Sequence, residues 1–293
     1  TPPNDAMTPT TCRRPTNTGP QTRPSCVSYR ASINLNTLTS RGVTPSLTTI
    51  FVSEFIGTAL LLLLGIGVGC NQNLKKSFGN GPNWLLTSFG WGFAVFVGAS
   101  VAWKSGAQLN PAVTIGLAMS DSSSQDWDTV PIYITAQVLG AMFGAVLAYL
   151  LYKKQFDTNE DNTSTGGLFY TSASVPAVGW NLLSEAIATF VLVYWVLASS
   201  PFIAGTGDSP PEFGNAALGY AGVAFTVIAV GASLGGATGY AINPARDFGP
   251  RFAYWLLPIK GKGSSNWGYA WIAITGPIIG GALAALFFNL VNA

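Results

Sequence analysis

Asn110-Pro111-Ala112 and Asn243-Pro244-Ala245 are two copies of one tripeptide, and they decide the fold of this 293-residue chain. Each opens an apolar stretch, at about 109–119 and 242–257, that is too short to cross a bilayer. Asn is a preferred helix N-cap, and Pro suits the first helical position because its missing N–H would have no partner there. Each tripeptide therefore predicts the start of a half-length helix. Two ordinary helix caps in surface loops are the alternative.

The two tripeptides belong to an internal repeat. They lie 133 positions apart (110 to 243), while Glu54 and Glu185 are 131 apart and Gly140 and Gly276 are 136 apart. A helix needs about 20 apolar residues to cross about 30 Å of hydrocarbon. Six stretches are that long: roughly 50–70, 84–103, 130–152, 178–203, 215–234 and 267–291. With three spans in each copy, the second copy enters the membrane upside down, as in many transporters and channels.

These observations predict an all-α membrane protein with six transmembrane helices and two half-helices in an inverted repeat. The channel domain covers 50–293, with repeat 1 at about 50–152 and repeat 2 at about 178–291. Only 9% of the residues are charged, against about a quarter in soluble domains, and the net charge is +2. This composition excludes a typical soluble enzyme and a basic surface for nucleic acid. The chain has no His and only three Cys, so we expect no metal site, cofactor or catalytic residue.

Residues 1–49 differ from the rest of the chain. They are rich in Thr, Pro, Ser and Asn, with five arginines and one acid. Such a segment cannot bury a core, so we expect a disordered cytoplasmic tail. An Arg-rich transit peptide and a gene-model artefact are the alternatives.

The paired half-helices have a physical consequence at the bilayer midplane. Two helix N-termini that meet there each contribute roughly half a positive charge, and the amides of Asn110 and Asn243 add donors. Non-helical backbone at that depth must line a water-filled cavity, so a pore is implied. Arg246 must face this pore or its mouth. We expect the unwound segments before the boxes to expose carbonyl oxygens as a track, from Gly106, Ala107, Gln108, Gly239 and Ala241.

The chain resembles the major intrinsic protein family of aquaporins over about 51–291. The resemblance rests on Ser-Gly-Ala-Gln-Leu-Asn-Pro-Ala-Val-Thr at 105–114 and on Asn-Pro-Ala-Arg-Asp-Phe-Gly-Pro-Arg at 243–251. Asp247, together with Gly231 in place of the His of water-selective members, resembles the glycerol-conducting (aquaglyceroporin) branch. This implies a passive channel for glycerol, other small neutral solutes and water. It also implies a homotetramer in the cell membrane with both termini in the cytoplasm.

The resemblance also assigns a selectivity filter to Trp91, Gly231, Tyr240 and Arg246. The interval from Trp91 to the first box is one residue shorter than in the family, so Phe89 or Gly90 is the alternative. Gln108 stands where the family usually has His, which argues against a proton-controlled gate. Among rival functions, a water-selective pore is the nearest.

Glu54 and Glu185 are acids inside predicted spans, which makes them candidates for function. Because they occupy matching positions in the two repeats, we expect them to accept hydrogen bonds from the loops before the boxes. The alternative is a proton relay in a coupled secondary transporter. Asp247 is expected to hold the second loop or Arg251.

Overall fold

The computed structural model describes residues 45–123, 125–203 and 215–293. The predicted tail at 1–49 therefore lies outside the described residues, except for its last five positions. Within the described ranges all regular structure is helical and no strand is present. The prediction of an all-α fold is confirmed.

Long apolar helices form the body of the protein. They are α1 (Leu47–Asn73), α2 (Trp84–Val101), α4 (Val130–Leu151), α6 (Val178–Ile203), α7 (Asn215–Leu234) and α9 (Trp267–Asn292). Five of them, all but α7, are long and apolar enough to cross a membrane in their described parts. The 20 residues of α7 rise about 30 Å. Helix α1 begins three residues before its predicted start because the Oγ of Ser46 caps it, accepting from the N–H of Thr49 at 3.1 Å.

Two half-length helices begin at the prolines of the two boxes, as the sequence predicts. Helix α3 (Pro111–Met119) has 9 residues and α8 (Pro244–Leu256) has 13. The Oδ1 of Asn110 accepts from the N–H of Ala112 at 2.9 Å, and the Oδ1 of Asn243 accepts from that of Ala245 at 3.0 Å. The remaining short elements are η2 (Trp103–Ser105), η3 (Trp127–Thr129), α5 (Lys153–Thr158) and η4 (Thr165–Leu168).

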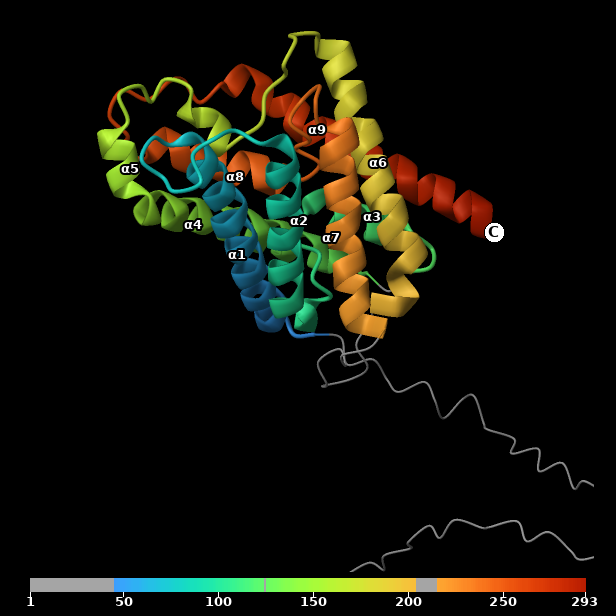
Figure 1. Cartoon of the computed structure of the whole chain (residues 1–293). Coiled ribbons are helices and arrows are strands. Elements are labelled where there is room, and N and C mark those ends of the chain that lie inside the picture. The colour runs from blue at the N-terminus through green and yellow to red at the C-terminus, as the bar shows by residue number, and fades with distance from the viewer. Residues whose placement is uncertain (1–44, 124, 204–214) are drawn as a thin grey trace, which may run out of the picture. The chain divides into compact units, whose positions relative to one another are not determined.

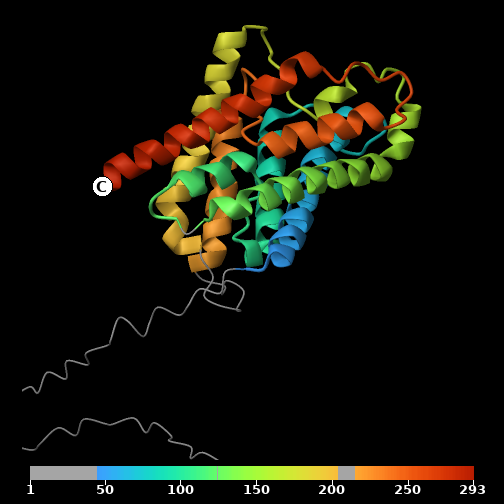
Figure 2. The ribbon, with the colours of Figure 1, turned by 180° about the vertical axis from the view of Figure 1, so that it is seen from behind.

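The helices pack in two equivalent sets. Helix α1 packs against α2 and α4, and α6 packs in the same way against α7 and α9, while α2 and α7 join the sets. Figures 1 and 2 show α1, α2, α7 and α6 running side by side, with α4 and α9 crossing them. Each half-helix packs against the last helix of the other repeat, α3 against α9 and α8 against α4. The half-helices are thereby held between the repeats.

Paired glycines allow the closest helix contacts. A Cβ added to Gly144 would lie 2.2 Å from the carbonyl oxygen of Ala59, and one added to Gly280 would lie 2.2 Å from that of Ala186. Any side chain at these positions would push α4 from α1, or α9 from α6. Small residues at helix contacts are typical of membrane proteins, where backbones pack directly.

Candidate functional site

The segments before the two boxes have the same unusual backbone. Ala107 and Leu109 have φ angles of 54° and 53°, and Tyr240 and Ile242, 133 positions later, have 41° and 43°. Residues other than Gly rarely adopt this left-handed backbone conformation, so contacts with the surrounding structure must hold the two loops in it.

Glu54 holds the first loop. Its carboxylate accepts from the backbone N–H groups of Gln108 at 3.0 Å and Leu109 at 2.7 Å. It also accepts from the hydroxyl of Ser105 at 2.6 Å and from the side-chain amide of Gln137 at 2.9 Å. All four donors together fix the carboxylate and the loop as one unit.

Glu185 holds the second loop in the equivalent way. It accepts from the backbone N–H groups of Ala241 at 2.9 Å and Ile242 at 3.0 Å. Both Glu54 and Glu185 are fully buried, and neither lines the two hollows described below. Both carboxylates thus accept hydrogen bonds from the loops before the boxes, as the sequence predicts for loop-supporting residues.

The two boxes are bonded to each other across the centre of the protein. The Nδ2 of Asn110 donates to the carbonyl of Ile242, and the Nδ2 of Asn243 donates to that of Leu109, each at 2.8 Å. Each amide has a second N–H, and both side chains line the cavity described next. The N-termini of α3 and α8 therefore bring their positive ends and two free donors to one place.

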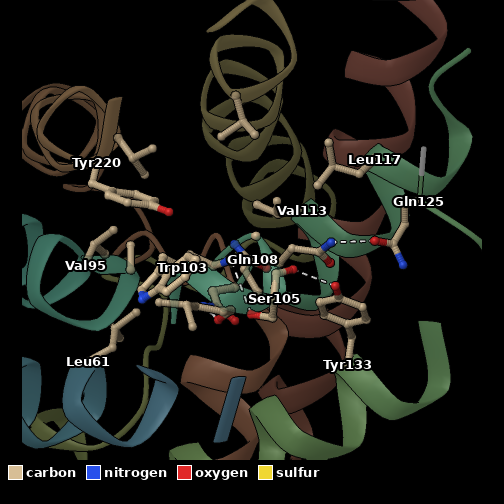
Figure 3. A pocket seen from close by; sticks show the side chains of 18 of the residues that line it. Leu61, Val95, Trp103, Ser105, Gln108, Val113, Leu117, Gln125, Tyr133 and Tyr220 are labelled. Atoms are coloured by element: carbon tan, nitrogen blue, oxygen red, sulfur yellow. Dashed lines mark hydrogen bonds between the residues drawn. The ribbon is translucent and has the colours of Figure 1, made fainter. Parts of the chain in front are cut away.

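A cavity of about 1110 Å³ passes these boxes. It opens beside Ser46, Lys104 and Gln125, here named the Gln125 mouth, and it ends at Trp91 and Arg246. Figure 3 shows part of it, with Trp103, Gln108, Val113 and Tyr133 among the side chains that line it. A second hollow of about 220 Å³ is lined by Asn73, Asn83 and Pro82, and Trp91 and Arg246 line it as well. These two side chains separate two hollows that approach from opposite sides.

The cavity has two chemically different walls. The polar wall is backbone: residues 106–109 and 240–242 line it, and no hydrogen bond within the described ranges uses the carbonyl oxygens of 106–108, 240 or 241. The facing wall comes from α1, α2, α6 and α7 and carries apolar side chains: Leu61, Val95, Ala99, Leu192, Val196, Val223 and Val227. Of the predicted track residues, Gly106, Ala107, Gln108 and Ala241 line the cavity and Gly239 does not, because it packs beside Thr171.

Arg246 and Trp91 form the division between the hollows. The guanidinium carbon lies 3.8 Å from the centre of the indole ring, and Nη1 donates to the carbonyl of Phe169 at 3.0 Å. Tyr240 lines the cavity next to them. Phe89 is exposed and Gly90 packs against Val68, so neither reaches the cavity.

Gly231 is close to this group, but it is not part of the lining. A Cβ at this position would lie 2.8 Å from Cζ of Tyr240 and 3.0 Å from its hydroxyl oxygen. The space that Gly231 leaves is therefore occupied by the Tyr240 ring and is not open to a solute. Gly231 thus leaves room for the Tyr240 ring, and its assignment to a selectivity filter stays a prediction.

A comparison with known families agrees with this geometry. A family model described as "Major intrinsic protein" matches residues 43–288. The chain belongs to the major intrinsic protein family. With five helices that can cross a membrane in its described parts, this family member is an integral membrane protein.

Individual relatives of this major intrinsic protein are similar over most of their length. The "Glycerol uptake facilitator protein" of Bacillus subtilis is 46% identical over 242 residues, which cover 82% of this chain and 84% of the relative. The "Probable glycerol uptake facilitator protein" of Thermotoga maritima is 45% identical over 241 residues, covering 82% and 98%. The crystal structure of the aquaglyceroporin from Plasmodium falciparum has a TM-score of 0.69 at 29% identity, covering 85% of this chain and 98% of that one.

In this major intrinsic protein, a buried ion pair between Asp247 and Arg251 lies on the same helix as Arg246. Asp247 accepts from Nε of Arg251 at 2.8 Å, and also from the N–H and hydroxyl of Thr171 at 2.8 and 2.7 Å. Arg251 donates to the carbonyls of Thr171, Ser265 and Asn266. Asp247 thus binds Arg251, one turn later on α8, and connects this helix to the 169–171 segment. Of the two expected partners, the second loop and Arg251, the bonds described here are to Arg251.

Sequence reasoning missed three groups around the cavity. They are the Phe169 carbonyl that holds Arg246, Gln125, whose Oε1 accepts from Nε2 of Gln108 at 2.6 Å, and Tyr220 on α7. The first two act through contacts between segments distant in sequence, so no local pattern marks them. Tyr220 had only a weak signal, because Thr226 and Ser233 also place hydroxyls in the same span. No cluster of His, Cys, Asp or Glu that could hold a metal occurs in the described ranges.

Proposed function

We propose that this protein is a passive channel for glycerol and other small neutral solutes, with water. The observation that carries the proposal is the two-sided lining that runs past the bonded boxes to Arg246 and Trp91. Relatives named glycerol uptake facilitators at 42–46% identity support the choice of solute. The expectation that the chain is not an enzyme belongs to the same proposal.

The two walls suit a molecule that has hydroxyl groups along one side and a carbon chain along the other. Its hydroxyls accept from the free N–H groups of Asn110 and Asn243 and donate to the unused carbonyls of the loops. Its carbon chain lies against the apolar wall, so apolar surface on both sides is removed from water, which is favourable. At the division, Arg246 offers fixed donors beside the faces of Trp91 and Tyr240.

Charged solutes meet an unfavourable field in the same place. The N-termini of α3 and α8 and the guanidinium of Arg246 all place positive charge on the path. A cation or hydronium ion loses hydration there without gaining a negative partner, because Glu54 and Glu185 are outside the lining. The same point disfavours the proton-coupled transporter, and Gly231 in place of His disfavours the water-selective pore.

Reconstitution in lipid vesicles tests the proposal. We expect faster reswelling in glycerol than in empty vesicles, a smaller effect for a larger polyol, and equal concentrations inside and outside at the end. An internal pH dye should stay constant during the glycerol flux. Accumulation of glycerol against its gradient, or movement of protons with it, would contradict a passive channel.

The assembly and orientation are part of this proposal. We propose a homotetramer in the cell membrane with both termini in the cytoplasm, as the family resemblance implies. Many large apolar side chains point outward from the described helices, and they suit contacts with lipid or a neighbouring copy. Cross-linking in native membranes and protease access from either side measure these two properties.

A further inference from the structure

Tyr220 places a polar group on the apolar wall of the cavity. It lies on α7 eleven residues before Gly231, which is about 16 Å along the helix axis. Gly231 is beside the Tyr240 ring at the filter, so Tyr220 belongs to the other half of the cavity, toward the Gln125 mouth. Figure 3 shows its ring reaching from α7 with the hydroxyl directed into the cavity.

The Tyr220 hydroxyl faces the cavity and has no hydrogen-bond partner within the described ranges. The residue is only 4% exposed, and none of the residues that the structure describes makes a hydrogen bond with it. Its neighbours along the lining are Val223 and Val227 of the same helix and Val196 of α6, which have no polar side-chain atoms. A hydroxyl that faces the cavity from an apolar wall, with no partner within the described ranges, is free to donate to or accept from a solute there.

The opposite wall at this half of the cavity is the first loop. The carbonyl oxygens of Gly106, Ala107 and Gln108 line it and accept no hydrogen bond within the described ranges. Gln108 itself is held in place by Glu54 through its N–H and by Gln125 through its side chain. A solute between these walls meets carbonyl acceptors on one side and, on the other, a hydroxyl that can donate or accept.

We propose that Tyr220 and the carbonyls of 106–108 form a second hydroxyl-binding station, distinct from the filter at Arg246, which selects solutes with three hydroxyl groups over those with fewer. This inference rests on the proposed function of the channel. A triol can turn one hydroxyl to Tyr220 while two remain on the loop carbonyls. A diol satisfies the loop alone and leaves the phenol without a partner.

Tyr220→Phe tests the station because it removes one oxygen and keeps the ring. Tyr269→Phe is the matched control, since the Tyr269 hydroxyl likewise has no partner within the described ranges but is buried outside the cavity lining. Vesicles containing each variant and the unchanged protein are compared for permeability to glycerol, 1,2-propanediol and water. The glycerol permeability of the unchanged protein tests the channel itself, so failure of the channel proposal is recognised separately.

The expected result is a loss of discrimination. In Tyr220→Phe the ratio of glycerol to 1,2-propanediol permeability falls about fivefold, the effect of one hydrogen bond, while water permeability changes by less than about twofold. Tyr269→Phe leaves both ratios unchanged. An unchanged ratio in Tyr220→Phe overturns the proposal, and so does a parallel change for all three solutes, since that would mean a general change in pore width.

Discussion

Gly231→Ala is the sharpest test of how the filter is built. The ring of Tyr240 is backed by two glycines, Gly231 on α7 and Gly235 directly after its end. An added Cβ would lie 2.8 Å from Cζ at Gly231 and 2.3 Å from Cδ1 at Gly235. The ring also meets the indole of Trp84 edge to face, with 5.8 Å between the ring centres. An added methyl group at Gly231 would therefore displace the Tyr240 ring toward the cavity, because the other directions are occupied.

The size of the effect follows from the contact distances. The ring must move until the 2.8 Å contact reaches the 3.4–4 Å of ordinary packing. Overpacking of this kind costs about 1–3 kcal/mol, and each 1.36 kcal/mol in a barrier is tenfold in rate. When a glycerol molecule fills the filter, this cost adds to its barrier, so glycerol permeability should fall roughly fivefold to hundredfold. A water molecule is smaller, so its permeability should change by less than about twofold.

Stopped-flow light scattering of vesicles measures both permeabilities in one preparation. Gly236→Ala is the control, because a Cβ there meets nothing within 4 Å. Equal losses of water and glycerol in Gly231→Ala, or no loss of glycerol, would refute the reasoning that this glycine sets the position of the Tyr240 ring.

Three further changes test the supporting structure. In Glu185→Gln, one amide oxygen replaces two carboxylate oxygens, so one buried N–H of the loop loses its acceptor, which costs about 1–3 kcal/mol of stability. The unfolding temperature should therefore fall. The control Glu160→Gln changes an exposed residue and should leave the unfolding temperature unchanged. Because the chain has no His, and the ion pair with Lys75 lowers the pKa of Glu160, permeability should change by less than about twofold between pH ~5.5 and ~7.5; a sharp transition in a pH series would contradict this. Asp247→Asn leaves the guanidinium of Arg251 buried without its counter-charge, which should cost about 3–5 kcal/mol in thermal unfolding, and changing both residues to apolar ones should recover most of that loss.

Much of the architecture is determined by local chemistry that the sequence states directly. The two Asn-Pro-Ala boxes start half-helices because Asn caps and Pro begins a helix, and this depends on no distant contact. The apolar stretches form long helices because their length and hydrophobicity match a bilayer. The repeat spacing then places Glu54 and Glu185 at equivalent positions, from which the sequence predicted their bonds to the loops.

The filter and the walls of the cavity were decided by the tertiary structure. The sequence indicated Trp91, Tyr240 and Arg246, but left Phe89 and Gly90 open, because spacing along a helix does not state which face meets the pore. It assigned Gly231 to the filter, and only the tertiary structure shows that the Tyr240 ring packs against this glycine. The carbonyl of Phe169 reaches Arg246, and the hydroxyl of Tyr220 reaches the cavity, only because segments distant in sequence pack together. A backbone oxygen or a single tyrosine has no local signature of such a contact.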